Sequence, residues 1–235
     1  MATFLAVLEL CRAEYYSVFA QNYDSSFLAY PFTQPHGFCR AGLVLYGRYP
    51  ITSSLRRSFP IATSISKFVD LDRCYSVSRI PVDNGKELVI INLHISAYGN
   101  DDAIREGQIA MLCESLEEEY AAGNYVICGG DFNHDLKALG EDDSPRESWA
   151  YPFPRNELPE HFAFGMDGLS QEERDALGNS ARNADQPYEE GVTYTVMLDG
   201  FIISDNVECI TYETIHTGYA YSDHDPVYME FLLAE

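Results

Sequence analysis

The stretch YVICGGDFNHD, residues 125–135, holds the densest group of side chains that could do chemistry. Four largely apolar residues lead into Gly129 and Gly130, and Asp131 and Asn133 follow at once. A short apolar run that ends at glycines predicts a buried strand with polar residues at its carboxyl end, where open sheets place their ligand sites. Asp131 could bind a cation or take a proton, and Asn133 offers a donor and an acceptor without charge. A polar turn is the other interpretation, since turns favour Asp, Asn and Gly.

Three further segments place ionisable side chains beside apolar runs: Asn92-Leu93-His94, Leu198-Asp199-Gly200 and Ser222-Asp223-His224-Asp225-Pro226. With residues 125–135 they supply histidines, carboxylates and amides together. This combination suits metal-assisted attack of water on a phosphate ester. A cation polarises the phosphoryl oxygen, a carboxylate or histidine takes the proton of the water, and further donors stabilise the transition state. A carboxylate behind a histidine would fix its tautomer and raise its basicity.

The composition predicts one globular domain over residues 1–235. Hydrophobic residues make up 46% of the chain, and 17 Tyr with 13 Phe favour strands over a helical bundle. Fifteen Lys and Arg stand against 37 Asp and Glu, a formal net charge of -22. Such a charge repels polyanions and disfavours binding of duplex DNA through a basic face, although a bound cation reverses the sign locally.

The hydrophobic pattern predicts strands with few helices. Asn84-Gly85, between two strand-like runs at 74–82 and 87–94, predicts a hairpin. A helix is expected over 103–121, with its glutamates, Glu119 among them, facing solvent. Further strands are expected at 15–20, 41–46, 125–128, 194–204, 208–212 and 226–232.

Two stretches are expected to be mostly irregular. Residues 21–40 indicate an extended loop, and residues 137–190 a long surface excursion with one short helix near 170–177. Many strands and few helices indicate an α+β fold with mainly antiparallel sheets.

The sequence leaves the cellular compartment open. The six cysteines have no metal-ligand spacing, which favours buried free thiols over zinc or disulfides. No apolar run approaches the roughly 18 residues of a membrane span, and no basic residue precedes the apolar patch at the amino terminus, as a secretory signal would require. The protein is expected to be cytoplasmic or, if an anchor or signal lies upstream, membrane-attached or extracellular.

In chain order, the motifs NLH, GDFN, LDGF and SDHDPV resemble those of the endonuclease/exonuclease/phosphatase superfamily, over roughly residues 15–235. The resemblance implies a four-layer α+β sandwich, two mainly antiparallel sheets flanked by helices. It also implies a phosphoesterase that uses one or two Mg²⁺ or Mn²⁺ ions. Members normally begin with a strand carrying an Asn and a second strand ending in Gln-Glu, whose Glu is the principal metal ligand. Neither motif is recognisable here, so the first strands are expected to be missing or rebuilt, with Glu9 the only early candidate.

The same resemblance assigns the central catalytic roles. His224 is implied to be the catalytic histidine, oriented by Asp199. Asp131 is implied to align or deprotonate the attacking water and to contact a metal. Asp223 is implied to be a metal ligand.

Substrate contacts are implied for residues around this centre. Asn133 would orient the phosphate through its amide. His94 would contact the phosphate or act as a general acid, with Asn92 supporting it from the same strand face. Arg182, Asn183 and Tyr188 in the long excursion could add contacts, although a surface loop without such a role is the simpler interpretation.

Three functional hypotheses follow. The first is a metal-dependent phosphoesterase acting on a small phosphoester, a lipid headgroup or single-stranded nucleic acid rather than duplex DNA. The second is a non-catalytic or impaired member of the superfamily that serves as a binding domain, which the missing Gln-Glu favours. The third is a calcineurin-like metallophosphoesterase, suggested by GGDFNHD, although the early Asp-x-His of that family is absent. The oligomeric state stays open.

Overall fold

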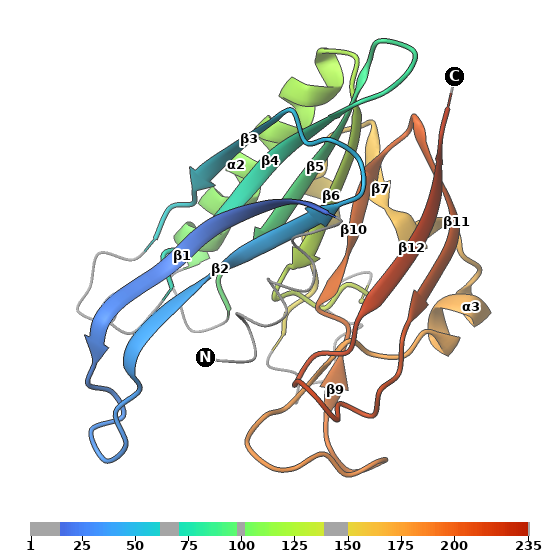
Figure 1. The fold of residues 1–235 in the computed structure, drawn as a ribbon. Helices are drawn as coiled ribbons and strands as arrows, with labels where there is room; N and C mark the ends of the chain where they lie inside the picture. Colours follow the sequence, from blue (N-terminus) through green and yellow to red (C-terminus); the bar gives the residue numbers. More distant parts are fainter. Residues whose placement is uncertain (1–14, 62–70, 98–101, 139–149, 235) are drawn as a thin grey trace.

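The computed structural model describes residues 15–61, 71–97, 102–138 and 150–234, and its centre is a six-stranded sheet (Figure 1). The sheet has the strand order β3-β4-β5-β6-β10-β7. Its strands are β3 (Ser53–Ser58), β4 (Cys74–Pro81), β5 (Glu87–His94), β6 (Tyr125–Asp131), β7 (Phe162–Phe164) and β10 (Asp199–Ser204). Neighbouring strands are antiparallel except β5 and β6, which are parallel and have helix α2 (Asp102–Ala121) between them in the sequence.

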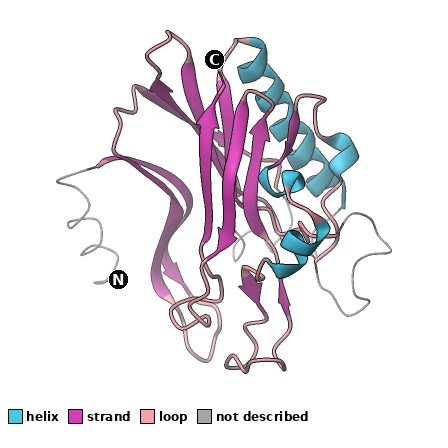
Figure 2. Ribbon diagram, turned by 90° about the vertical axis from the view of Figure 1, so that its right-hand side faces the viewer, coloured by secondary structure: helices cyan, strands magenta, loops and turns pink. Residues whose placement is uncertain are grey.

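Two two-stranded ladders lie on one face of this sheet, and the helices lie on the other (Figure 2). Strands β1 (Tyr16–Leu28) and β2 (Gly37–Gly47) pack over β4 and β5. Strands β11 (Val207–Thr214) and β12 (Val227–Leu233) pack over β6 and β10. The α+β sandwich predicted from the sequence is confirmed, and the residues that the structure describes form three of its layers.

Short elements complete the fold. They are the small ladder of β8 (Ala181–Arg182) and β9 (Thr195–Val196), the 3₁₀ helices η2 (Arg155–Glu157) and η3 (Gly165–Gly168), and helix α3 (Gln171–Ala176). Ser170 caps α3 by accepting a hydrogen bond from the Glu173 N–H, as expected for the short helix near 170–177. Among the described helices, none is long and apolar enough to cross a lipid bilayer.

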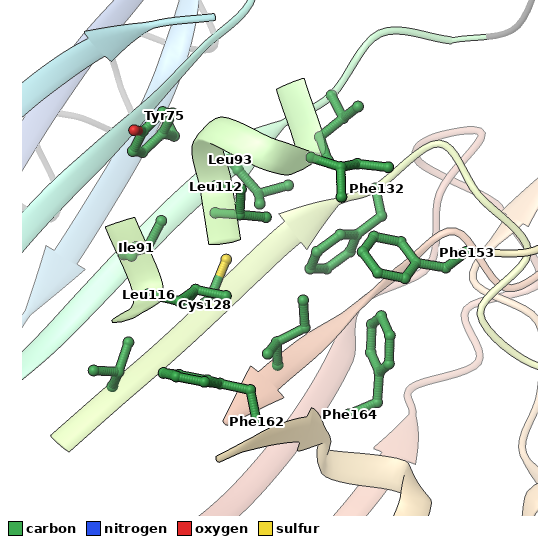
Figure 3. Packing of buried hydrophobic residues seen from close by; sticks show 14 of the residues in the cluster. Tyr75, Ile91, Leu93, Leu112, Leu116, Cys128, Phe132, Phe153, Phe162 and Phe164 are labelled. Carbon is green, nitrogen blue, oxygen red and sulfur yellow. The ribbon is translucent and has the colours of Figure 1, made fainter. Parts of the chain in front are cut away.

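Helix α2 covers the sheet through one apolar stripe. Ile109, Leu112 and Leu116 are almost fully buried against apolar side chains of β4, β5 and β6 (Figure 3). Burial of each such side chain contributes about 1.5–3 kcal/mol. The helix ends before Gly123, whose φ of 88° few other residues adopt. The helix predicted over 103–121 is confirmed.

The opposite face of the sheet carries an apolar cleft between the two ladders. The cleft has a volume of about 340 Å³ and is lined mainly by hydrophobic side chains from β2, β5, β6, β10 and β12. Leu45 reaches it from β2, and Met229 and Phe231 reach it from β12. Within the described residues the second layer is therefore divided into two ladders rather than joined as one sheet.

The loop predicted for residues 21–40 is wrong. β1 runs on to Leu28 and β2 begins at Gly37, so only about eight residues connect the strands. The pair is held by antiparallel backbone hydrogen bonds from Tyr16 opposite Gly47 to Leu28 opposite Gly37. The sequence signal was weak because no side chain at the far end of this hairpin, residues 24–28 and 37–40, is fully buried, so there is no apolar face to mark a half-buried strand.

Two other element predictions need correction. The strand expected at 194–204 is two strands, β9 and β10, separated by the buried Met197 and Leu198. The excursion after residue 137 is less irregular than expected, because β7 joins the edge of the main sheet beside β10. Three-residue strands lack a periodic pattern long enough to detect.

Glu119 is buried rather than solvent-facing. Its carboxylate accepts hydrogen bonds from the guanidinium of Arg79 on β4 and, at 3.1 Å, from the side chain of Asn124. This pairing offsets the cost of burying the charge. The predicted hairpin at Asn84-Gly85 is confirmed, with only Gly85 at positive φ.

Candidate active site

Three predicted site residues stand in one row across three neighbouring strands. His94 ends β5 opposite Asp131, which ends the parallel strand β6, and Asp131 lies opposite Asp199, which begins the antiparallel strand β10. Parallel strands end at the same edge of a sheet, and an antiparallel neighbour begins there. The Nε2 atom of His94 lies 3.2 Å from Oδ2 of Asp131. The structure thus brings together side chains that lie about 100 residues apart in the sequence.

The two glycines before Asp131 do not end the strand, in contrast to the prediction. β6 continues through both of them. Only glycine fits at these two positions, because neighbouring atoms fill the space that a side chain would need. A Cβ at Gly129 would lie 2.7 Å from the ring of Phe201, and a Cβ at Gly130 would lie 2.1 Å from the carbonyl oxygen of Leu93. Gly130 also has a φ of 143°, which L residues rarely adopt. The glycines allow the strand to deliver Asp131 to the sheet edge.

Asn133 is fixed in the turn after β6. Its φ is 49°, a left-handed conformation that Asn tolerates better than most residues. Its backbone N–H donates to Oδ1 of Asp131 at 2.8 Å, and its side-chain Nδ2 donates to the carbonyl of Ile95 at 2.9 Å. The second proton on Nδ2 is left for a substrate oxygen.

His224 contacts Asp199 from the loop before β12. The two side chains meet at 2.7 Å between Nδ1 and Oδ2, and the imidazole donates because a carboxylate only accepts. This hydrogen bond fixes the tautomer of His224 and turns Nε2 away from Asp199. The pairing predicted from the motifs is present.

Ser180 holds Asp199 in place, a contact that no sequence motif predicted. Its hydroxyl donates to Oδ2 of Asp199 at 2.8 Å and accepts from the backbone N–H groups of Leu198 and Asp199, each at 3.0 Å. Ser180 is fully buried. Backbone contacts hold Ser180 in this position: its carbonyl accepts a hydrogen bond from the Asp225 N–H at 2.7 Å, and the next residue, Ala181, forms an antiparallel β-bridge with His224.

Burial and neighbouring charges act in opposite directions on the pKa values of the two carboxylates of this row. Burial raises the pKa of Asp131, but contact with His94 and the charges of His94 and His224 outweigh it, so the pKa falls below its usual value. Burial also raises the pKa of Asp199, and the charge of the neighbouring Asp131 raises it further. The hydrogen bond and charge of His224 lower it, but the net result is a pKa above the usual value.

His224 titrates far from the usual range of a histidine. Burial alone lowers the pKa of its imidazole, but the hydrogen bond to Asp199 and the charges of Asp199, Asp131 and Asp223 raise it to about 9. At neutral pH His224 therefore carries a positive charge.

A divalent cation fits beside this row. One carboxylate oxygen each from Asp131 and Asp199 lies within 4.8 Å of the other and of a ring nitrogen of His224, which is protonated and therefore does not act as a ligand. Carboxylate oxygens are the ligands that Mg²⁺ and Mn²⁺ prefer, and a cation would offset the repulsion between Asp131 and Asp199. Asp223, predicted as a metal ligand, is exposed at the rim, where its Oδ1 accepts from the Ser222 hydroxyl at 3.2 Å. Its role as a ligand stays a prediction, and Glu9 lies outside the described residues.

A pocket of about 430 Å³ opens beside His224. It is lined on one side by Asn133, Leu198, Asp223 and His224, and on the other by the segment 182–185. Arg182 and Asn183, considered above as substrate contacts, therefore border the predicted catalytic residues. Tyr188 instead packs against the ring of Tyr219, with 4.8 Å between ring centroids.

Asn92, predicted to support His94 in substrate binding, has another contact. Its side-chain Nδ2 donates to the carbonyl of Val44 at 3.1 Å and so ties β5 to β2. It lines the apolar cleft rather than the pocket beside His224. A substrate contact by Asn92 stays a prediction.

Three polar residues near the motifs have structural partners. Nδ1 of the buried His134 lies 2.6 Å from the carbonyl of Phe132. Oδ1 of Asp135 accepts from the backbone N–H of Lys137 at 3.0 Å, and Asp225 accepts from the Thr217 N–H at 3.2 Å. These contacts stabilise the loops that carry the site.

Comparisons with known proteins give structural matches only. A scan against models of protein families finds no match, and a search of curated proteins also finds none. The human Nocturnin catalytic domain with bound sulfate anion is 18% identical, with a TM-score of 0.62 over 99% of this chain and 76% of that one. The endonuclease/exonuclease/phosphatase from Beutenbergia cavernae is 15% identical, with a TM-score of 0.63 over 98% and 57% of the two chains.

A third match has a named chemical activity. The mannosyl-6-phosphatase from Bacteroides thetaiotaomicron is 15% identical, with a TM-score of 0.57 over 98% of this chain and 82% of that one. At these identities the likeness concerns the fold. The chain has the endonuclease/exonuclease/phosphatase fold, as its motifs predicted.

Proposed function

We propose that this protein is a divalent-metal-dependent phosphoesterase that cleaves a phosphate ester by attack of water. The observation that carries the proposal is the row of His94, Asp131 and Asp199 at one sheet edge, completed by His224 on Asp199. These side chains could supply a general base, a charged hydrogen-bond donor and carboxylate ligands for a metal ion. Transfer of a phosphoryl group to water requires these three kinds of group.

Asp131 is the proposed base. It is ionised at neutral pH because its pKa is lowered, and it is held by the Asn133 N–H on one oxygen and by contact with His94 on the other. A water molecule beside it transfers a proton to the carboxylate while the water oxygen attacks phosphorus. The bond from phosphorus to the leaving oxygen breaks on the opposite side.

His224 and Asn133 are proposed to hold the phosphoryl group. Because Nδ1 of His224 donates to Asp199, the charged imidazole has its Nε2–H left for a non-bridging phosphoryl oxygen. Asn133 adds the second N–H of its amide. Such donors stabilise the charge that develops in the transition state. His94, whose Nε2 lies 3.2 Å from Oδ2 of Asp131, is proposed to contact the phosphate or to act as a general acid.

Asp131 and Asp199, with Asp223 at the rim, are the residues that would hold the metal ion. A bound Mg²⁺ or Mn²⁺ supplies charge neutralisation on the phosphoryl and leaving oxygens.

The proposed substrate is small. The net charge of -22 repels long polyanions, so a small phosphoester, a lipid headgroup or a short single strand is favoured over duplex DNA. Support comes from the neighbour that is a mannosyl-6-phosphatase and from the sulfate, a phosphate-like anion, in Nocturnin.

Hydrolysis of bis-p-nitrophenyl phosphate and of a phosphoester panel in Mg²⁺ or Mn²⁺ tests the proposal. We expect His224→Ala and Asp131→Asn each to lower kcat by about 10²–10⁴-fold. His161→Ala is the matched control, since His161 forms another His–Asp pair, 2.8 Å from Asp205, away from the row. This variant should keep the wild-type rate.

The same assay separates the proposal from the binding-domain hypothesis. A non-catalytic domain gives no metal-dependent turnover, and the two active-site variants then do not differ from the wild type. Equal rates in wild type, His224→Ala and Asp131→Asn would refute the site assignment.

A further inference from the structure

Arg182 and the protonated His224 are the cationic side chains among the described residues that line the pocket, and of these two only Arg182 has no carboxylate partner. The rest of the lining carries Asp185 and Asp223, and the site behind it carries Asp131 and Asp199. A positive charge in addition to that of His224, in otherwise acidic surroundings, marks where a further anionic group can bind.

The backbone fixes Arg182 relative to the catalytic segment. Its N–H donates to the carbonyl of Asp223 at 3.0 Å, and the next residue, Asn183, donates to the carbonyl of Tyr194 at 2.9 Å. Arg182 therefore lies in a short strand between β9 and the segment of His224. This arrangement holds the arginine at a set position beside His224.

The guanidinium is oriented but not neutralised. Its Nη1 donates to the carbonyls of Asn183 at 2.9 Å and Gln186 at 3.1 Å, so the loop wraps around it. Its Nε is buried and has no hydrogen-bond partner, and Nη2 has no acceptor within the described part of the chain. Arg182 makes no ion pair with any carboxylate among the described residues, so its charge and Nη2 are left for a ligand.

We propose that Arg182 binds a second phosphate group of the substrate, in the same pocket as the phosphate that reacts at His224. A guanidinium with a free edge matches an oxyanion, and phosphate directs oxygens to several sides at once. One oxygen can accept from Nη2 of Arg182 while another accepts from the side-chain amide of Asn183. This inference rests on the proposed function for the reacting phosphate, and it narrows the substrate to a phosphoester with two phosphates.

Competition against bis-p-nitrophenyl phosphate tests this, because that substrate has no anionic group beyond its reacting phosphate. The competitors are inorganic phosphate, pyrophosphate, malonate and the 5′-phosphorylated thymidine dinucleotide, in excess free Mg²⁺. We expect pyrophosphate or the dinucleotide to compete at least about tenfold more tightly than phosphate, as one charge-assisted hydrogen bond contributes roughly ten- to hundredfold in affinity. The tighter of the two identifies a small bisphosphate or a short strand as the source.

Arg182→Gln should remove this preference, so that pyrophosphate and the dinucleotide compete no more tightly than inorganic phosphate. Arg182→Lys keeps the positive charge but lacks the planar set of N–H donors of the guanidinium, so this variant should keep part of the preference for the second phosphate. Arg40→Gln is the matched control, because Arg40 is exposed on the far hairpin near Asp24 and its loss changes the net charge equally. Thermal unfolding of each variant checks that the protein folds.

The outcomes separate this inference from the proposed function. Turnover with equal inhibition by phosphate and pyrophosphate, or an unchanged preference in Arg182→Gln, overturns the inference and leaves the function standing. Inhibition by malonate as strong as by pyrophosphate overturns the assignment to phosphate. Calorimetry supplies a readout without turnover: pyrophosphate binding that depends on Arg182 in a protein without hydrolytic activity supports the inference and refutes the function.

Discussion

At the scale of single residues, the charge on His224 depends on its hydrogen bond to Asp199. The pKa of His224 is raised to about 9 because this bond and three nearby carboxylates outweigh the effect of burial. We predict that Asp199→Asn moves the pKa of His224 in the metal-free protein down towards the usual value. Titration of the His224 ring protons by NMR measures this, and an unchanged midpoint in the variant would contradict it.

The same bond makes stability depend on pH. The folded-state pKa of His224 lies above the unfolded value of about 6.5, so the protonated imidazole stabilises the fold fully below that pH and the contribution is lost as pH rises to about 9. The free energy of unfolding of the metal-free wild type should therefore fall across this window. In Asp199→Asn the fall should be smaller, which denaturant unfolding at several pH values can test.

The candidate site residues could be predicted from the sequence, but the residues that hold them in position through hydrogen bonds could not. His94, Asp131, Asn133, Asp199 and His224 stand in motifs whose residue types reveal them. Ser180 carries no local signal, since it reaches Asp199 only because its segment pairs with the loop of His224, more than forty residues away. A contact set by tertiary pairing has no pattern in the neighbouring sequence.

At the scale of elements, the end of β6 depends on a residue without a side chain. Gly130 has a φ of 143°, and a Cβ there would lie 2.1 Å from the Leu93 carbonyl of the neighbouring β5. We predict that Gly130→Ala destabilises the fold by about 2–5 kcal/mol, from backbone strain and overlap together. It should also lower activity, because the strand can relieve the overlap only by moving Asp131 away from His94.

Gly168→Ala is the matched control. Gly168 has no positive φ, and a Cβ there meets no atom within 4 Å. Urea unfolding and hydrolysis of bis-p-nitrophenyl phosphate should leave this variant close to the wild type. Equal stability of the two variants would show that β6 tolerates a side chain at Gly130.

Elements with a buried face were predicted from the sequence, and elements without one were not. Helix α2 places Leu112 and Leu116 on one stripe, and the hairpin of β4 and β5 has its turn at Gly85. The distal part of β1 has neither signal, because its order comes from backbone pairing with β2. The buried Glu119 was mispredicted for a related reason: its partner Arg79 lies on another element.

At the scale of the whole molecule, the order of the motifs identified the fold while leaving the pairing of its outer strands open. Amphipathic patterns tell which face of a strand is buried, but not which strands are neighbours. The division of the second layer into β1–β2 and β11–β12, with Leu45 and Met229 facing a common cleft, is a property of pairing. It follows from the assembled structure alone.

The net charge of the molecule leads to a prediction about salt. A charge of -22 repels an anionic substrate over a distance that shrinks as the Debye length falls from about 30 Å at 0.01 M to about 8 Å at 0.15 M ionic strength. We predict that kcat/KM for an anionic phosphoester rises by roughly two- to tenfold across this range, with most of the change in KM. An enzyme that attracts its substrate through a basic face shows the opposite trend.

Exchange of two exposed acids on α2 isolates the effect of this field. Glu114→Lys with Glu117→Lys replaces a negative by a positive charge at each position, so the net charge changes from -22 to -18, and neither residue lines the pocket. The rise of kcat/KM with salt should be smaller in this variant, and its value at low salt should be higher than in the wild type. If kcat/KM instead falls with salt in both proteins, the local charges of the metal, His224 and Arg182 govern substrate capture, and the surface field has no measurable part in it.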